Sequence, residues 1–245
     1  MSALFTVPIA STGGSIVCTN PTAGQDEQQN IYHRYPKGVV VTTSGIAKFY
    51  SNGLDLDLAM STEGFLDQWL WKLFRRFLTY PMPTVCLLNG HAFAGGFMLA
   101  MYHDYRIQNP DKGFLCINEL EFGVPLQTPM MSIFREKLPA TTFRNVVLEA
   151  HRFGGKASLH AGIVDGLGGL EEAVALIRGR KLLNKAETGI YGTMKEEMYA
   201  RVLNGLDDHV GNLEWREKLE QKKEQLQSIS LQNVKDFEKG HKAKL

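Results

Sequence analysis

The sequence has little net charge, few cysteines and no long hydrophobic run. Among its 245 residues, 27 basic side chains stand against 26 acidic ones, which gives a net charge of +1. Such a chain has no bulk electrostatic attraction to nucleic acid or to an anionic membrane, so an anionic ligand must be held by a local site. No apolar run approaches the ~18 residues that a membrane span needs. We therefore expect no nucleic-acid partner and no membrane span.

The cysteines are odd in number and widely spaced. Cys18, Cys86 and Cys116 each lie in an apolar, strand-like segment. This pattern fits neither a zinc site nor a disulfide framework. We expect buried free thiols, either in a reducing compartment or simply sequestered from solvent.

Several catalytic signatures are also missing. The sequence has no GxSxG elbow, no GxxxxGKS phosphate loop and no HExxH motif, and its seven histidines show no metal-ligand spacing. We therefore predict no metal site. The N-terminal segment MSALFTVPIASTGG lacks a basic region, so we do not expect a secretory signal.

What the sequence does contain is an alternation of short strands and helices. The β-branched run at residues 38–45 and the run at 83–88 predict strands buried on both faces, and residues 15–20 predict a further strand before a polar loop. Apolar residues at i, i+3 and i+4 spacing predict one helix over residues 65–78, ended by prolines. Further strands are predicted at 105–107 and 114–117, and further helices at 93–103, 141–151, 170–181, 194–204 and 215–239.

Three places could carry chemistry. Gly53 follows a strand where the backbone must turn closely, and Gly95-Gly96 opens an apolar helix although each glycine there costs about 1 kcal/mol relative to alanine. Free N–H groups at a helix start can stabilise an oxyanion, but close packing against a strand is an equal alternative. The third place is Glu119, in an apolar run that would make its carboxylate a stronger base, unless it points to water.

These three places, in this order, resemble the motifs of the enoyl-CoA hydratase/isomerase (crotonase) superfamily. VVVTTSGIAKFYSNGLDLDL (39–58) looks like its K-x-F-x-x-G-x-D strand and turn, and LNGHAFAGGFMLAMYHDYRI (88–107) looks like its N-G-x-A-x-G-G helix opening. NELEFGVP (118–125) resembles the strand that carries the acid, and GKASLHAGIVDG (155–166) resembles the A-x-x-x-G-(L/I)-V-D element. The resemblance covers residues 15–185. It implies an α/β fold, the crotonase-like ββα superhelix (spiral), with a core domain over residues 1–185 and a C-terminal helical region over 186–245.

The resemblance also implies a site. The backbone N–H groups of Leu54 and Gly95 would form an oxyanion hole for a thioester carbonyl, and Glu119 would move a proton from C2 to C4 of a 3-enoyl-CoA. Glu121 is the alternative acid, because residues two apart share a strand face. Ser51, Asn52, Gly53, Gly96 and Met98 would contact the substrate, with Ser51 and Asn52 along the route of the CoA moiety, whereas Asp55 would be structural. Phe97, Met98, Met130 and Met131 fit either an acyl pocket or ordinary core filling.

Met98 also separates two activities. Hydratases of the superfamily carry a second glutamate at this helix position, which the methionine cannot replace. The pattern is therefore most similar to the peroxisomal Δ3,Δ2-enoyl-CoA isomerases of plants and fungi, which need no cofactor beyond the CoA of the substrate. A hydratase or another crotonase chemistry would need a further polar group, for which Asp104 and Glu121 are the nearby candidates. A non-catalytic acyl-CoA-binding protein is the third possibility.

The C-terminal residues bear on the oligomeric state and on the location of the protein in the cell. The superfamily resemblance implies a homotrimer or hexamer, and the polar stretch from Trp215 to Lys239 fits a surface helix or one that supports an oligomer through a thin apolar seam. Lys218, Lys222 and Lys223 could meet the CoA 3′-phosphate of a neighbour, with a solvated face as the simpler interpretation. Ala243-Lys244-Leu245 is a conservative variant of the Ser-Lys-Leu address, which predicts a peroxisomal import receptor as partner and the peroxisome as location.

Overall fold

The structure, a computed structural model, describes residues 5–9, 14–18 and 38–242, with side chains from residue 38 to residue 239. The polar loop expected after residue 20 and the C-terminal tripeptide lie outside the described residues. The chain divides into two compact units, Met1–Leu206 and Asp207–Leu245. The second unit contains the long helix α11 (His209–Lys242).

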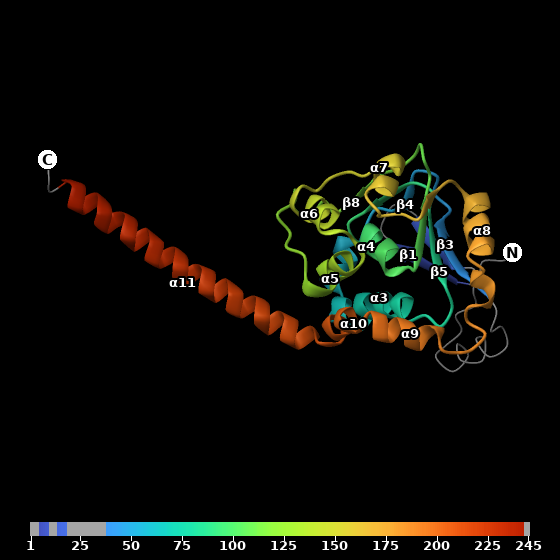
Figure 1. The fold of residues 1–245 in the computed structure, drawn as a ribbon. Coiled ribbons are helices and arrows are strands. Elements are labelled where there is room, and N and C mark those ends of the chain that lie inside the picture. The colour runs from blue at the N-terminus through green and yellow to red at the C-terminus, as the bar shows by residue number, and fades with distance from the viewer. Residues whose placement is uncertain (1–4, 10–13, 19–37, 243–245) are drawn as a thin grey trace. The chain divides into compact units, whose positions relative to one another are not determined.

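Two sheets organise the first unit (Figure 1). The larger one has the strand order β1-β2-β3-β5-β7-β9, in which β1 and β2 are antiparallel and the strands from β3 to β9 are parallel. The smaller one has the order β4-β6-β8 and is parallel throughout. The strands are β1 (Phe5–Ile9), β2 (Gly14–Cys18), β3 (Val40–Ser44), β4 (Phe49–Ser51), β5 (Thr84–Leu88), β6 (His91–Phe93), β7 (Tyr105–Gln108), β8 (Leu115–Cys116) and β9 (Gly166–Leu167).

Helices connect these strands, as parallel pairing requires. They are α2 (Leu56–Ser61), the π-helix η1 (Phe65–Leu70), α3 (Trp71–Leu78), α4 (Gly95–Tyr102), α5 (Thr128–Lys137), α6 (Ala140–Leu148), α7 (Gly155–His160), α8 (Leu170–Gly179), the 3₁₀-helix η2 (Leu182–Asn184), α9 (Tyr191–Met198) and α10 (Ala200–Asp207). The α/β class predicted from the sequence is confirmed. Helix α4 starts two residues later than predicted, because His91–Phe93 forms β6.

The single helix predicted over residues 65–78 was wrong in one respect. Its first part is the π-helix η1, in which the N–H of Trp71 bonds to the carbonyl of Leu66, five residues earlier. A π-turn holds one residue more than an α-turn, so it shifts the phase of the apolar stripe. Trp69, one of the apolar residues at that predicted spacing, is therefore 65% exposed, whereas Trp71 is buried.

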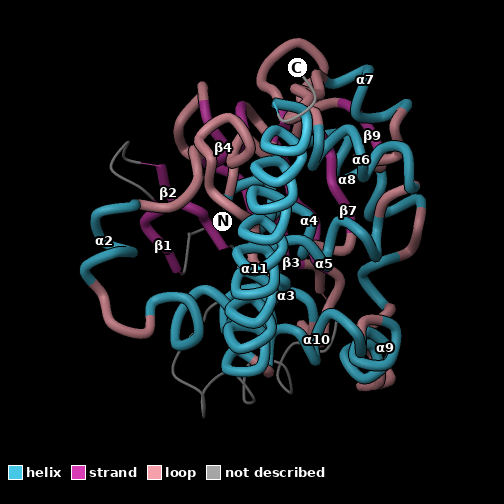
Figure 2. The backbone as a smooth tube through the Cα atoms, turned by 90° about the vertical axis from the view of Figure 1, so that its left-hand side faces the viewer, coloured by secondary structure: helices cyan, strands magenta, loops and turns pink. Residues whose placement is uncertain are grey.

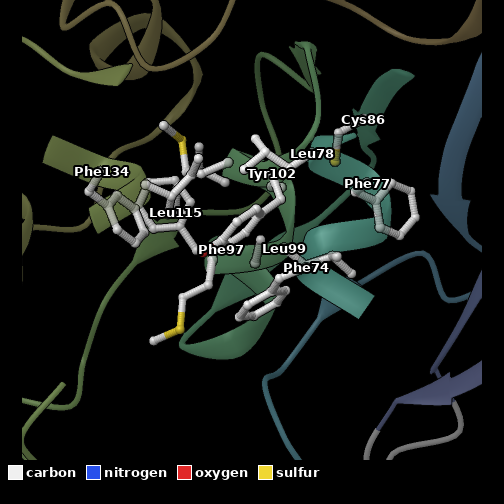
Figure 3. Close-up of a cluster of buried hydrophobic side chains, with 14 of the residues drawn as sticks. Phe74, Phe77, Leu78, Cys86, Phe97, Leu99, Tyr102, Leu115 and Phe134 are labelled. Carbon is white, nitrogen blue, oxygen red and sulfur yellow. The ribbon is translucent and has the colours of Figure 1, made fainter. Parts of the chain in front are cut away.

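Strand β5 lies at the centre of the fold, and every residue in it is buried. Cys86 and Leu88 join a large cluster with side chains of α3 and α4, among them Phe74 and Tyr102 (Figure 3). Val85 and Leu87 point to the other face, into a second cluster with α8. Helix α8 contacts both β5 and β9, and Figure 2 shows it near β9. This two-sided burial confirms the prediction from the uninterrupted apolar run.

The thiols of Cys86 and Cys116 are free and buried, as expected, while the side chain of Cys18 lies outside the described residues. Burial raises the pKa of both described thiols, to about 12 for Cys86 and about 11 for Cys116. Neither sulfur is therefore a nucleophile near neutral pH.

The first unit continues past residue 185, where the superfamily resemblance placed the end of the core. Tyr199, Val202, Leu203 and Leu206 belong to the same buried cluster as α3 and α4. The Lys195 ammonium also donates to the carbonyl of Phe77 at 3.0 Å. Helices α9 and α10 are therefore part of the core's packing, and the division of the structure falls after Leu206.

A buried histidine links α4 to the central sheet. His103 is 0% exposed, with Nε2 2.9 Å from the Thr42 hydroxyl and Nδ1 2.9 Å from the Leu99 carbonyl. Since a carbonyl can only accept, Nδ1 carries the proton and Nε2 accepts from Thr42. Burial lowers the pKa of His103 to about 3. The ring is thus neutral in the folded protein at any pH where the protein is expected to work.

The pKa of His103 predicts a loss of stability in acid. The unfolded chain takes up this proton near pH 6.5, but the folded chain does so only near pH 3. Because the unfolded state binds more protons in this window, the unfolding free energy should fall as pH drops below 6.5, by about 1.4 kcal/mol per pH unit from this group. Urea unfolding of wild type and His103→Gln between pH 7 and pH 4 tests this.

The variant should be less stable at pH 7, and its deficit should shrink toward pH 4 because it lacks this proton uptake. His160→Gln, at an exposed histidine, is the control and should run parallel to wild type. A deficit for His103→Gln that stays constant across the range would contradict the assignment.

Candidate active site

The three parallel strands of the small sheet end at the same edge. Ser51 of β4 is in register with Ala92 of β6, and Phe93 of β6 with Cys116 of β8. Backbone pairing between β6 and β8 continues one residue past the end of β6, since the Ala94 N–H donates to the Cys116 carbonyl at 3.0 Å. Ligands in α/β proteins bind beyond the carboxyl ends of parallel strands. The structure thus brings the three segments singled out in the sequence to one edge.

The turn after β4 is made possible by glycine. Gly53 has φ +103°, which other residues rarely adopt, and a Cβ there would lie 3.2 Å from the Cβ of Ala94. The turn therefore touches the start of α4. Asp55 then caps α2 by accepting the Leu58 N–H at 3.1 Å, which is a structural role.

Helix α4 begins with a strained residue. Ala94 has φ +49° and ψ −124°, a conformation that costs of order 1–3 kcal/mol and is often found at functional sites. The Ala94 carbonyl accepts the Met98 N–H at 3.0 Å, so it points into the helix. Because the C=O and N–H of a trans peptide point in opposite directions, the N–H of Gly95 points back out of the helix start.

Two backbone amides meet at this contact. A Cβ on Gly95 would lie 3.1 Å from Cγ and 3.6 Å from the backbone nitrogen of Leu54. In the part of the chain that the structure describes, neither the Leu54 N–H nor the Gly95 N–H donates to a protein group. Free donors of this kind, one of them at a helix N-terminus, can stabilise a developing oxyanion.

Both interpretations of the helix glycines apply, to different residues. Gly95 presents a free amide, whereas Gly96 provides close packing, since a Cβ on it would lie 2.6 Å from the Cβ of Ser51. Ser51 is 3% exposed and its hydroxyl accepts the Gly53 N–H at 3.2 Å. It therefore lies beneath the turn, whereas Asn52 is exposed on it.

Glu119 does not lie on a strand, and that prediction was wrong. Strand β8 ends at Cys116, and residues 119–123 form a turn in which the Glu119 carbonyl accepts the N–H groups of Phe122 and Val124. Gly123, with φ +69°, allows the chain to reverse there. The rule that residues two apart share a strand face therefore does not apply to Glu119 and Glu121.

The two glutamates lie in different environments. The Glu121 side chain is 49% exposed and pairs with Arg152 at 3.5 Å. In Glu119, by contrast, Oε2 is buried and has no hydrogen-bond partner among the described residues. Burial raises the pKa of Glu119 above its ordinary value of 4.5. A desolvated carboxylate with one unpaired oxygen is a stronger base, which favours Glu119 over Glu121 as the candidate acid/base.

Sequence reasoning missed Asn118. Its Oδ1 is also buried without a partner among the described residues, directly before Glu119. The only signal in the sequence was a polar residue beside the acid in an apolar run. Two buried side-chain oxygens without a partner, on consecutive residues, indicate a site that receives polar groups from a ligand.

Asp104, one of the candidates for a second acid, is held by an ion pair and a hydrogen bond to other parts of the fold. Asp104 pairs with Lys195 at 2.9 Å and accepts the Thr84 N–H at 2.8 Å, which ties the end of α4 to β5. Met98 is 0% exposed and packs in the main core cluster together with Phe97. For these two α4 residues the core-filling interpretation holds, while Met130 is partly buried against the same cluster.

The described residues contain no group of three or more His, Cys, Asp or Glu side chains that could hold a metal ion. None of their helices is long and apolar enough to cross a membrane.

Known proteins resemble this chain in sequence and in fold. Residues 32–240 match the profile of the enoyl-CoA hydratase/isomerase family. "Enoyl-CoA delta isomerase 1, peroxisomal" of Arabidopsis thaliana is 35% identical over 180 residues, which are 69% of this chain and 73% of the relative. "Enoyl-CoA delta isomerase 3" of the same plant is 31% identical over 192 residues, 72% of this chain and 80% of the relative.

Among solved structures, a probable enoyl-CoA hydratase of Mycobacterium tuberculosis superimposes with a TM-score of 0.64 at 22% identity, covering 80% of this chain and 85% of that one. This likeness confirms the crotonase fold with its parallel sheets and long C-terminal helix. With the profile match over most of its length and two relatives above 30% identity, the chain belongs to the enoyl-CoA hydratase/isomerase family.

Proposed function

We propose that this protein is an enoyl-CoA isomerase that converts 3-enoyl-CoA into trans-2-enoyl-CoA. The observation that carries the proposal is the buried Oε2 of Glu119, at the sheet edge where the Leu54 and Gly95 amides also lie, and none of these groups has a partner among the described residues. Isomerisation needs one group that takes a proton and returns it, whereas hydration needs a second acid, and α4 offers Met98 at that position. The delta-isomerase names of the plant relatives agree with this.

In the proposed reaction, the thioester oxygen lies between the N–H groups of Leu54 and Gly95. Glu119 takes a proton from C2, and the electrons of the C2–H bond form a dienolate whose negative oxygen the two amides stabilise. The protonated Glu119 then returns the proton at C4, which moves the double bond from C3 to C2. The proton count is unchanged and nothing is oxidised or reduced.

The environment of Glu119 suits both steps. Its raised pKa makes the carboxylate a better base for C2, and the neutral acid formed in the first step is the form that burial favours. A positioned acid/base contributes roughly 10²–10⁴-fold in rate.

The first test replaces the acid. Purified wild-type protein should convert 3-hexenoyl-CoA to the conjugated 2-enoyl product, and Glu119→Gln should lower kcat by about 10²–10⁴-fold because the amide cannot accept the proton. Glu121→Gln is the matched control, since it removes an exposed carboxylate two residues away, and its kcat should stay near wild type. The ultraviolet absorbance of the conjugated 2-enoyl product measures the reaction rate.

The outcomes separate the alternatives. Equal rates for wild type and Glu119→Gln would move the acid/base elsewhere. Hydration of 2-enoyl-CoA by the wild type at comparable speed would favour a hydratase. Binding of CoA esters with no turnover would indicate a non-catalytic member.

The pH profile gives a second test. Glu119 must be ionised to accept the proton, so kcat/KM should fall in acid with a midpoint above 4.5, the ordinary pKa of a glutamate. Initial rates between pH 4 and pH 8 measure this midpoint. A midpoint at or below 4.5 would show that the base is a solvated carboxylate.

The proposed location is the peroxisome, and the proposed partner there is its import receptor. One of the plant relatives, enoyl-CoA delta isomerase 1, carries "peroxisomal" in its name, and residues 243–245 read Ala-Lys-Leu. A fluorescent protein fused to the N-terminus should collect in peroxisomes, and deletion of the tripeptide should leave it in the cytosol. Replacing Gln225 with Ala at an exposed position serves as the control and should not alter import. Equal import with and without the tripeptide would refute the signal.

The proposed assembly is a homotrimer or hexamer. On α11, Trp215, Leu219, Leu226 and Phe237 are exposed and recur at helical spacing on one face, which an oligomer would cover. Lys218 pairs with Glu214 at 3.7 Å and Lys223 with Glu220 at 2.8 Å, which supports a solvated lysine face.

Light scattering should therefore give three or six times the 27.4 kDa of one chain. Leu226→Lys should lower this mass by placing a charge in the apolar stripe, whereas Gln225→Lys adds the same charge on another face and should not. A monomeric wild type would contradict the assembly.

A further inference from the structure

We propose that Ser51 is a positioning residue that holds the Leu54 and Gly95 amides toward one oxygen atom. This inference rests on the proposed function, because the positioning matters when a negative oxygen forms between the amides. It also changes the role that sequence reasoning gave Ser51, from contact with the CoA moiety to control of the oxyanion site.

A β-bulge aims the side chain of Ser51 into the protein. Phe49 pairs with His91 and Ser51 pairs with Ala92, so β4 takes two residues where β6 takes one. Bulges re-aim side chains and often lie next to active sites. Ser51 thereby shares the inner side with Ala92, which is 0% exposed, and is itself 3% exposed.

On one side, Ser51 organises the turn. Its hydroxyl oxygen accepts the N–H of Gly53 at 3.2 Å, a bond from a serine to its own backbone two residues on. This bond fixes the peptide before Gly53, whose φ of +103° then sets the direction of the following amide. The turn that carries the N–H of Leu54 is thus held, while this N–H has no acceptor among the residues that the structure describes.

On the other side, Ser51 supports the start of α4. A Cβ on Gly96 would lie 2.6 Å from the Cβ and 2.7 Å from the Oγ of Ser51, so the helix approaches as closely as a residue without a side chain allows. Gly95, whose amide is free, is the residue directly before. One small side chain therefore contacts both the turn that presents Leu54 and the helix start that presents Gly95.

This arrangement affects the transition state more than the bound substrate. Hydrogen-bond donors accelerate a reaction when they are already aimed at the position where charge develops. Without the Ser51 hydroxyl the Gly53 N–H loses its acceptor, and the peptide that carries the Leu54 N–H is no longer held. Loss of alignment lowers kcat, whereas loss of a contact with the CoA moiety would raise KM.

The experiment compares Ser51→Ala with wild type on 3-hexenoyl-CoA. We expect kcat to fall by about 10–100-fold with KM within about threefold of wild type. The second readout is the spectrum of bound 3-oxobutanoyl-CoA, which forms an enolate with a negative thioester oxygen and its own ultraviolet absorbance. The fraction bound as enolate at neutral pH should drop in Ser51→Ala, which a merely structural role would not produce.

Ser44 provides a matched control. Its hydroxyl accepts the N–H of Ile46 at 3.1 Å, the same two-residue bond, at the end of β3 in the large sheet. Ser44→Ala should therefore leave kcat and the enolate fraction unchanged while removing the same kind of bond. If Ser51→Ala fails to fold, Ser51→Cys takes its place, because its sulfur fills the site but accepts only weakly.

Four results would overturn the inference: an unchanged kcat and enolate fraction in Ser51→Ala, equal losses in Ser44→Ala, a loss confined to KM, or a wild type that binds 3-oxobutanoyl-CoA without forming the enolate. A wild type that does not isomerise 3-hexenoyl-CoA defeats the proposed function separately. In that case the enolate spectra of wild type and Ser51→Ala still decide whether Ser51 aims the amides.

Discussion

The site depends on how closely the turn after β4 approaches the start of α4. Gly53, Gly95 and Gly96 all lie at this contact, and a Cβ on any of them would come within 3.2 Å of a neighbouring atom. The approach brings together two amides that have no acceptor within the described part of the chain, which is unfavourable for buried backbone groups unless a ligand supplies the acceptor. A thioester oxygen is such an acceptor, and its hydrogen bonds become stronger as it gains negative charge.

The same approach explains why the choice of acid matters. In the proposed reaction the backbone stabilises the oxyanion, so the side chains need only move a proton and one glutamate is enough. A carboxylate at residue 98 would have to be buried beside Phe97 in the main cluster, where an unpaired charge is strongly disfavoured. Met98 fills that space at no such cost. The surroundings of α4 thus favour a site with a single acid, located in the turn after β8.

The residues of the site were easier to predict than their surroundings. Gly95 and Gly96 contradict the local preference of an apolar helix, and such contradictions mark functional places even in one sequence. The position of Glu119 in a turn could not be predicted, because in the sequence Gly123 is equally compatible with a turn and with the end of a strand. The inward direction of Ser51 depends on a bulge, and a bulge is set by pairing with β6, which is remote in sequence. For the same reason the π-turn that exposes Trp69 left no local signal.

The strain at the site has to be held by the rest of the fold. The unfavourable conformation of Ala94 and the buried Oε2 of Glu119, which has no partner among the described residues, both destabilise the folded chain, and neither would persist if the segment around it could relax. Relaxation is prevented because all eight residues of α4 are buried, so the helix cannot shift without opening the main cluster. At its other end, His103 and Asp104 bind it to β3, β5 and α9. A helix fixed along its whole length keeps its first amide in place, which is what a preorganised oxyanion site requires.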